Sequence, residues 1–591
     1  MLTTLTAPAF AKTWDIEKGD ITVKAGEAEG PNKVKQGDSD FVKDEGDTII
    51  TGTSDKNTVT IEAENKGDKV EVTLKDVNID TSSTGSAAVS VTGKGDTNIE
   101  LDGDNELKSG AGHAGLEHNK TDTSGELTIQ DKDNNGSLEA AGGFKGAGIG
   151  SAGSNDAQVK ITGGNITATS DDWGAGIGSG SYGTGTVEIT GGEINATGGY
   201  LGAGIGGGCN GSGNVTISGG TITAAGSDGA AGIGGGYYNG ATVTITGDAV
   251  IKNASSTKYG AGIGGGNGSD GNVTISGNAK IENATGGYGA AGIGGGAFSS
   301  PDKIGNGNVV IKDNAKIDNV QGGAYGAGIG GGIYGLSNVT IEGNTKVNAT
   351  GGAGGAAIGG GAGAENNSDN NGNQITIKSN ENGSPTINAV GGGTDEGEKI
   401  VIGGAGIGAG CESDADADIT LEGKVTITAT AGKDNVAIGA NGIEQEFSGL
   451  AEGSSITRYD PEGNDITLPT DPVPAVPSSS GGGSADASVQ ESVFPGLVVT
   501  DKDGQRISYT SIRDNNVLSL RVGRFTASLR ASLATLRQLR AEGIETITFQ
   551  TILCSTTLSV DELLAMGGED AEVVLTHHIR SSTLTVGGKA V

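Results

Sequence analysis

The sequence predicts an all-β protein, mainly a parallel β-helix solenoid, that ends in a small α/β or α+β domain. A motif of the type Gly-Ala-Gly-Ile-Gly recurs through most of the first 440 residues, with its isoleucines mostly 28 to 31 residues apart. Each repeat also contains three short segments of alternating apolar residues, for example residues 215–217, 221–224 and 231–233. A recurring period of this length is typical of a solenoid.

One repeat of about 28 to 30 residues therefore fits one coil with three short strands and three turns. Stacked coils would pair strand on strand at about 4.8 Å per coil, and the crossover rule favours right-handed coiling. The segments are too short for helices. The alternation predicts that the following residues point inward: Val215, Ile217, Ile222, Ala224, Ala231 and Ile233. It predicts that Thr216, Thr223 and Gly232 point outward.

Glycine supplies 114 of the 591 residues, which also suggests a low-complexity or disordered chain. The regular return of Val-x-Ile and Ala-Gly-Ile opposes disorder, and collagen would need a strict Gly-X-Y triplet. Composition and repeat together favour the β-helix.

Taken in order, residues 1–11 are expected to be the remnant of a signal peptide, because residues 9–11 read Ala-Phe-Ala before Lys12. An ordinary N-terminal segment is the alternative. Residues 12–140 are expected to form the opening coils and an N-terminal cap. Val89 and Leu116 continue the isoleucine column there, at spacings of 27 and 33 residues.

Residues 141–445 hold the regular coils, with insertions at 366–373 and 391–398. Residues 446–488 are expected to form a cap and a linker rich in Pro, Gly and Ser. Residues 489–591 differ in kind, because strand-like alternation occurs beside a segment of helical spacing at 525–538. They are expected to form the small C-terminal domain.

The net charge is −34, from 38 basic and 72 acidic residues. Residues 489–591 carry 10 Lys plus Arg against 11 Asp plus Glu, so the acidic excess belongs to the solenoid. This charge opposes binding to nucleic acid or to an anionic membrane. No apolar run reaches membrane-spanning length.

Three segments carry a family resemblance: Trp14-DIEKGDITV, Val72-TLKDVNID and Ile99-ELDGDNELKSGAGHAGLE, which lead into the GAGIGGG coils. They resemble the opening of exported carbohydrate-binding β-helix proteins of clostridial gut bacteria. The resemblance covers residues 12–445. It implies an exported carbohydrate-binding protein, which fits a secreted or cell-surface adhesin for a polysaccharide or other glycan. We expect a monomer without catalytic activity.

Aromatic residues flank the Ala-Gly-Ile-Gly segments. The predicted glycan-binding residues are Trp173, Tyr182, Tyr200, Tyr237, Tyr259, Tyr288, Tyr325 and Tyr334. If the coils stack in register, these rings border a strip whose outward positions are glycine, which would receive sugar rings by stacking. The alternative is that the rings stack on one another and stabilise turns. Columns of Asn, such as Asn253, Asn283 and Asn319, predict structural ladders.

Calcium is the cofactor that the sequence suggests. Asp131, Asp133 and Asn135 precede Gly136, as in the first half of a calcium loop, although Gly142 stands where a bidentate Glu is expected. Asp414, Asp416 and Asp418 form a second candidate set. Solvated acidic turns are the alternative for both.

No catalytic residues are predicted. The pair Asp171-Asp172 and the group His113, Glu117 and His118 are the only suggestive clusters, and both fit ordinary turns. Two other functions stay open. The solenoid could be a stalk that displays the C-terminal domain, or it could be a polysaccharide lyase or a glycoside hydrolase.

Overall fold

The computed structural model describes residues 12–27, 30–297, 300, 303–365, 372–394, 402–472, 497–500, 506, 509–514, 516–522, 526–551, 555–566, 571–578 and 581–590. The chain divides into two compact units, a solenoid unit that continues to Thr467 and includes Asp471, and a C-terminal unit that includes the residues from Leu497 onward. The expected signal remnant lies outside the described residues, as do 473–488 of the expected linker and parts of both insertions.

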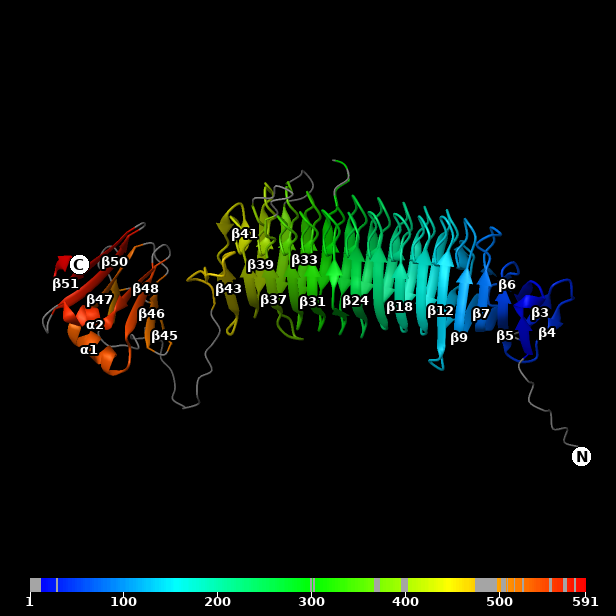
Figure 1. Ribbon diagram of the computed structural model, residues 1–591, viewed down its shortest axis with the longest axis horizontal. Coiled ribbons are helices and arrows are strands. Elements are labelled where there is room, and N and C mark those ends of the chain that lie inside the picture. Colours follow the sequence, from blue (N-terminus) through cyan, green and yellow to red (C-terminus); the bar gives the residue numbers. More distant parts are fainter. Residues whose placement is uncertain are drawn as a thin grey trace, which may run out of the picture. The chain divides into compact units, whose positions relative to one another are not determined.

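The described residues of the solenoid unit form one network of 43 strands. Figure 1 shows the strands stacked coil on coil. Each regular coil contributes three strands, and each strand pairs in parallel with its equivalent in the next coil. Ile205, Ile233 and Ile263 are successive register partners in the third strands. Val215 and Val243 are partners in the first strands. The chain is therefore a parallel β-helix with three short strands per coil, as predicted.

The strands form three columns. The first strands are β11 (Leu127–Gln130), β14 (Asp156–Ile161), β17 (Gly185–Ile189), β20 (Gly213–Ile217), β23 (Ala241–Ile245), β26 (Gly271–Ile275), β30 (Gly307–Ile311), β33 (Ser337–Glu342), β36 (Asn373–Lys378) and β39 (Ala417–Glu422). The second strands are β12 (Gly136–Gly142), β15 (Asn165–Ser170), β18 (Glu193–Thr197), β21 (Thr221–Gly226), β24 (Val250–Ser256), β27 (Lys280–Ile281) with β28 (Ala284–Thr285), β31 (Lys316–Gln321), β34 (Lys346–Thr350), β37 (Thr386–Val390), β40 (Thr426–Thr430) and β43 (Ser455–Tyr459). The third strands are β13 (Ile149–Gly150), β16 (Ile177–Gly178), β19 (Ile205–Gly206), β22 (Ile233–Gly234), β25 (Ile263–Gly264), β29 (Ile293–Gly294), β32 (Ile329–Gly330), β35 (Ile358–Gly359), β38 (Ile407–Gly408) and β41 (Ile438–Ala440).

The opening coils continue these columns with longer strands. They comprise β1 (Lys12–Asp15), β2 (Ile21–Lys24), β5 (Thr48–Ser54), β6 (Val59–Ala63), β7 (Lys69–Asp80), β8 (Val89–Gly93), β9 (Asp96–Lys108) and β10 (Leu116–Lys120). Val89, Leu116 and Ile149 are successive register partners, so the isoleucine column begins where the spacing predicts. The short strands β3 (Lys33–Gln36) and β4 (Val42–Lys43) add antiparallel pairs beside β2.

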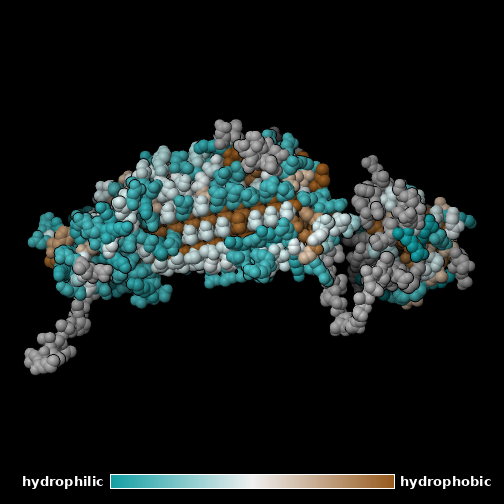
Figure 2. Space-filling model, turned by 180° about the vertical axis from the view of Figure 1, so that it is seen from behind, coloured by the Kyte–Doolittle hydropathy of each residue, from teal (hydrophilic) through white to brown (hydrophobic). Residues whose placement is uncertain are grey.

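The core lies inside the coils. The six residues predicted to point inward are buried, and Thr216 and Thr223 face outward. Because every coil repeats the same pattern, residues of one kind form lengthwise columns. Figure 2 shows one such face, with a band of hydrophobic residues and pale rows bordered by hydrophilic rows.

The prediction that Gly232 points outward is wrong. Gly232 is buried, and a Cβ at this position would lie 2.6 Å from the backbone nitrogen of Ser255 and 2.7 Å from the carbonyl oxygen of Gly262. The third strand has only two residues and is sharply bent, because Ala231 donates its N–H to the carbonyl of Gly235 at 2.9 Å. Adjacent coils pack on both sides of this bend. The glycines are therefore present for close backbone packing, not to form an open strip.

The last coil ends in a buried arginine. Arg458 on β43 is 0% exposed and continues an inward column of alanines, with Ala429 as its register partner. Its guanidinium donates to both oxygens of Asp471, at 2.6 and 2.9 Å, and also to Glu444. Because Arg458 is the only arginine in residues 1–488, this cluster removes the one guanidinium of the solenoid from solvent.

The C-terminal unit contains two sheets and two helices among its described residues. The strands are β44 (Leu497–Thr500), β45 (Thr510–Asp514), β46 (Val517–Arg521), β47 (Ala527–Ser532), β48 (Thr546–Gln550), β49 (Ser555–Ser559), β50 (Glu572–His578), β51 (Ser581–Val586) and β52 (Lys589–Ala590). The sheets have the orders β44-β47-β50-β51-β52 and β45-β46-β48-β49. The helices are α1 (Leu533–Ala541) and α2 (Val560–Ala565).

The helix expected at 525–538 begins later than predicted. Residues 527–532 form β47, because Ala527, Leu529 and Ala531 alternate into the core with period 2. Ser532 then caps α1, since its hydroxyl accepts a hydrogen bond from the backbone N–H of Thr535 at 3.1 Å.

Candidate functional site

The turns on either side of each third strand lie next to each other. The backbone N–H of Cys209, four residues after Ile205, donates to the carbonyl of Trp173 in the preceding coil at 2.7 Å. Tyr237 donates to Leu201 in the same way at 3.1 Å. The turn after each of these third strands is therefore hydrogen-bonded to the turn before the third strand of the preceding coil. Stacking of the coils places both kinds of turn residue side by side along the solenoid. We call their aromatic side chains the aromatic ridge: Phe144, Trp173, Tyr182, Tyr200, Tyr237, Tyr238, Tyr259, Tyr288, Tyr325 and Tyr334.

All eight sequence-predicted binding residues belong to this ridge, and Phe144 and Tyr238 join them. Phe298, at the equivalent position of a later coil, lies outside the described residues. What the alternation rule could not show is that the strip between the two rows is covered by backbone. The rings therefore project from turns above packed backbone, and they do not border a solvent-exposed strip of glycines.

Many of the ridge residues have a left-handed backbone. The φ angles are positive at Trp173, Tyr182, Tyr238, Tyr259, Tyr325 and Tyr334, between 57° and 71°. Other coils place glycine at the same turn positions, for example Gly229, Gly268 and Gly354. A bulky residue in this region is strained by about 1 kcal/mol or more, a cost that glycine avoids. The aromatic residues therefore occupy positions that backbone stability alone would assign to glycine.

The rings are accessible to solvent to different degrees. Tyr182 and Tyr200 are 58% and 51% exposed, and Tyr259, Tyr288 and Tyr334 are also exposed. Trp173, Tyr237, Tyr238 and Tyr325 are half-buried. A row of large exposed rings is unusual at a protein surface. Isolated exposed apolar residues are common, whereas contiguous ones mark interaction sites.

Some of the rings also contact one another. Phe144 and Trp173 have centroids 5.3 Å apart, and the Tyr288 centroid lies 6.1 Å from Tyr259 and 5.7 Å from Tyr325 in edge-on geometry. Such pairs contribute about 0.5–1.5 kcal/mol each. The ring contacts thus support the stabilising role for part of the ridge.

In one coil near the middle of the ridge, glycine replaces the aromatic residue in the turn before the third strand. Gly229 stands there at the position of Trp173 and Tyr259, and a Cβ on it would lie 2.4 Å from the Tyr237 ring. Tyr237 fills that space, and its hydroxyl donates to the Tyr238 hydroxyl at 2.7 Å. Burial, then the hydrogen bond with Tyr238, raises the pKa of Tyr237 to about 12. The Tyr237 phenol is therefore a neutral hydrogen-bonding group at physiological pH.

Buried polar atoms occur close to two of the ridge residues. Oδ1 of Asp172, next to Trp173, is buried and has no hydrogen-bond partner in the described structure, and the same holds for Oδ1 of Asn267 near Tyr237. Burial raises the pKa of the Cys209 thiol to about 11, with a smaller effect from the Asp172 carboxylate. Lys145 places its Nζ 5.2 Å from the centroids of both Phe144 and Trp173. Lys145 and Asp172 are the polar groups that the aromatic pattern alone did not identify.

The first calcium candidate is a local turn, whereas Asp414 and Asp416 precede β39 and Asp418 lies in it. Asp131 accepts hydrogen bonds from the backbone N–H groups of Asn135 and Gly136, both at 3.1 Å, so its carboxylate closes its own turn. Asp133 and Asn135 are exposed, as are Asp414, Asp416 and Asp418. No group of three or more His, Cys, Asp or Glu residues converges in the part of the chain that the structure describes. Calcium binding at either set of residues stays a prediction.

The clusters considered for catalysis are packed into the opening coils. Glu117 is buried and accepts from Ala114 N and Asn119 Nδ2, while Nδ1 of His113 lies 2.8 Å from it. His118 is buried, with its ring nitrogens facing the carbonyls of Val91 and Gly125. Desolvation lowers the pKa of His118 in spite of these carbonyls. These contacts hold a loop in place, and Asp171 and Asp172 remain a single pair of carboxylates at the ridge.

Comparison with known proteins agrees with this architecture. A family model described as "Beta helix repeat" matches residues 159–181, 187–209, 215–237 and 273–297. All four segments begin at the first-strand valine and end four residues after the column isoleucine, so the matched unit contains all three strands of one coil. The class is a parallel β-helix protein. No curated protein and no solved structure matches the chain. No described helix is long and apolar enough to cross a membrane.

Proposed function

We propose that this protein is a secreted or cell-surface β-helix that binds a polysaccharide through the aromatic ridge, acts as a monomer and carries out no catalysis. The observation that carries the proposal is the placement of exposed rings at left-handed turn positions, where glycine would cost less. Strain of this kind is retained where a side chain has a role beyond folding.

The chemistry of the ridge suits a sugar. The C–H face of a pyranose packs on an aromatic face, while its hydroxyl groups need hydrogen-bond partners. The phenol hydroxyls of the exposed tyrosines supply hydrogen-bond donors and acceptors beside the rings. Because the acidic excess belongs to the solenoid, a polyanionic glycan is repelled and a neutral glycan is favoured.

The test uses the full chain and a panel of neutral and anionic polysaccharides. Tyr182, Tyr259 and Tyr334 are replaced together by Asn, which tolerates the left-handed backbone, as Asn210 already shows at an equivalent turn. If each ring contributes about 1 kcal/mol, the affinity for a neutral glycan falls about 100-fold. Ser154→Asn is the matched control, because Ser154 occupies the same turn position with φ 65° and carries no ring.

The stalk function makes the opposite prediction. It is favoured by the contacts among Tyr259, Tyr288 and Tyr325, which stabilise the turns without any ligand. A stalk retains no glycan in the wild-type chain, and the triple variant unfolds more easily. New reducing or unsaturated sugar ends during incubation would instead indicate a hydrolase or a lyase.

A further inference from the structure

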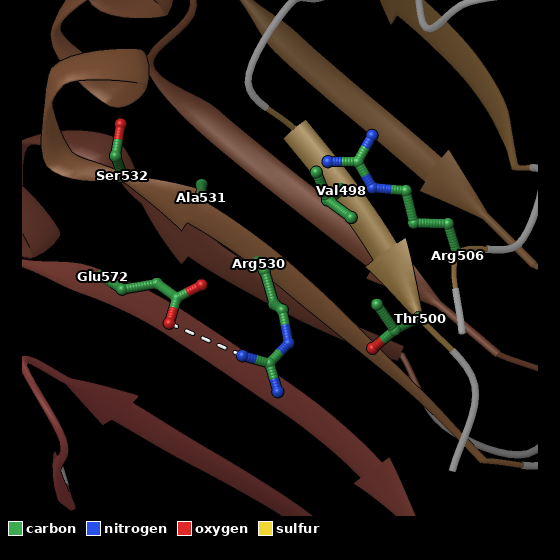
Figure 3. A pocket seen from close by; sticks show the side chains of 7 residues that line it. All are labelled: Val498, Thr500, Arg506, Arg530, Ala531, Ser532 and Glu572. Carbon is green, nitrogen blue, oxygen red and sulfur yellow. Dashed lines mark hydrogen bonds and ion pairs between the residues drawn. The ribbon is translucent and has the colours of Figure 1, made fainter. Parts of the chain in front are cut away.

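The C-terminal unit has a cavity of about 570 Å³ on the outward face of the sheet β44-β47-β50 (Figure 3). Register pairs Arg530 on β47 with Val498 on β44 and with Val574 on β50. The arginine stem therefore lies between two valines on the face opposite the core. Sheet pairing of strands that are distant in sequence thus creates an apolar floor with one central guanidinium.

Arg530 is only weakly paired. Its Nη1 lies 3.5 Å from Oε2 of Glu572, and both side chains are largely exposed. Figure 3 shows its guanidinium between Glu572 and Thr500. A single long contact leaves most of the five N–H donors of the fork available for a ligand.

Thr500 supplies an independent observation. It is 5% exposed and lines the cavity, yet its hydroxyl has no hydrogen-bond partner in the described structure. A buried hydroxyl without a partner is unfavourable and rare in native proteins. In Figure 3 the Thr500 oxygen is on the side of Arg530. The cavity wall therefore contains a hydroxyl donor that no described residue satisfies.

A second guanidinium comes from the edge of the same sheet. Arg506 forms an isolated antiparallel bridge with Thr500, which brings it to the cavity. It is exposed and forms no ion pair with any side chain that the structure describes. Ser532 is already used, since it caps α1. The cavity thus holds two arginines and one free hydroxyl against one carboxylate.

We propose that this cavity binds an oxyanion, a carboxylate or a phosphate, carried by a ligand whose apolar part rests on Val498. A guanidinium fork matches the two oxygens of either group. The Thr500 hydroxyl donates a further hydrogen bond, and Glu572 gives up its contact with Arg530. The site is independent of the aromatic ridge and takes the opposite class of ligand.

The experiment measures binding to the full chain by titration calorimetry, with inorganic phosphate and a trigalacturonate as the two probes. Saturable binding of one molecule of either probe supports the site, and the probe that binds identifies the oxyanion. Arg530→Gln weakens that binding at least 10-fold. Arg540→Gln, which removes an arginine paired with Asp561 outside the cavity, leaves it unchanged.

Two further variants separate binding from folding. Glu572→Gln tightens binding several-fold, because it removes the competing carboxylate. Thr500→Val weakens binding several-fold but leaves the unfolding midpoint unchanged or higher, since an unsatisfied hydroxyl is lost. Absence of saturable binding with both probes overturns the proposal, and so does an equal loss in Arg540→Gln. Arg530→Gln leaves retention of neutral glycans unchanged, so this test and that of the ridge fail separately.

Discussion

Two faces of each coil use their outward residues in different ways. On the face of the first and second strands, outward side chains bond to one another along the columns, as when Asn308 donates to Asn272 at 2.9 Å and Asn319 donates to Asn283 at 3.1 Å. At the third strand, the strand residues are covered and the turns carry exposed rings at strained positions. One face pairs its outward polar side chains along the columns, whereas the other exposes aromatic rings to solvent.

The largest expected effect comes from filling the covered bend. Gly206→Ala places a Cβ 2.0 Å from the carbonyl oxygen of Gly234 at a φ of 132°. Overpacking and backbone strain together should destabilise the solenoid by about 3 kcal/mol. Urea unfolding followed by far-UV circular dichroism measures this. Thr216→Ala, an outward change on the other face, should shift stability by less than about 0.5 kcal/mol, and an equal shift in both variants would contradict the comparison.

A smaller loss is expected on the ladder face. Asn319→Ala removes the hydrogen bond to Asn283 and should lower the free energy of unfolding by about 0.5–1 kcal/mol. The same urea series measures it, with glycan retention as a second readout. Retention should not change, because this column does not belong to the ridge.

Replacing a ridge tyrosine should have the opposite effect on the free energy of unfolding. Tyr182→Asn relieves a left-handed tyrosine that is 58% exposed, so stability should stay the same or rise by about 0.5 kcal/mol. Unfolding of the single variant beside Ser154→Asn measures the difference. A clear loss of stability would show that Tyr182 serves the fold, and the contrast between the two faces would fail.

A pH series sharpens the comparison in the opening coils, where His118 lies close to the column position Leu116. Burial lowers the pKa of His118 below its value in the unfolded chain, and the nearby Lys120 acts in the same direction. The unfolded state then binds more protons, so the contribution of His118 is complete above about pH 6.5 and decreases as pH falls through the depressed folded-state pKa. The stability difference between wild type and His118→Gln should shrink between pH 7 and pH 5. A constant difference would exclude titration of this residue.

The smallest effect concerns calcium at the two candidate sites. If Asp414, Asp416 and Asp418 bind the ion, millimolar calcium should raise the unfolding midpoint by about 1–2 °C, and replacing all three by Asn should abolish the rise. The calcium response of Asp131→Asn tests the other site. If calcium raised the unfolding midpoint equally in the wild type and in both variants, binding at both proposed sites would be excluded.

Much of the solenoid could be predicted from the sequence, because period-2 alternation and the column spacing are local signals. Ile205 and Ile233 are register partners for that reason. The burial of Gly232 could not be predicted, since alternation assumes that one side of each strand faces solvent, while here the bend is enclosed by neighbouring coils. The positions of the aromatic residues could be read from the repeat, but the left-handed backbone at many of these residues could not.

The cavity around Arg530 depends on long-range pairing. Thr500, Arg530 and Glu572 come from three strands that are adjacent only in the folded sheet, so no spacing rule joins them. Likewise, the stretch at 525–538 contains both a strand and a helix, and only the Ser532 cap marks the change. Sequence patterns identify elements well, whereas sites made by distant elements need the structure.

Nothing in a repeated coil ends the stacking of a solenoid, because every coil presents the same apolar surface and the same unpaired strand edges to the next coil. Open edges of this kind are where proteins polymerise end to end. Arg458 changes the last rung by placing a charge, held by Asp471 and Glu444, in a column that earlier coils fill with apolar residues, mostly alanine. Stacking another molecule there would require an apolar surface to accept a guanidinium. The last rung thus contains a buried ion cluster in a column that is apolar in the coils before it.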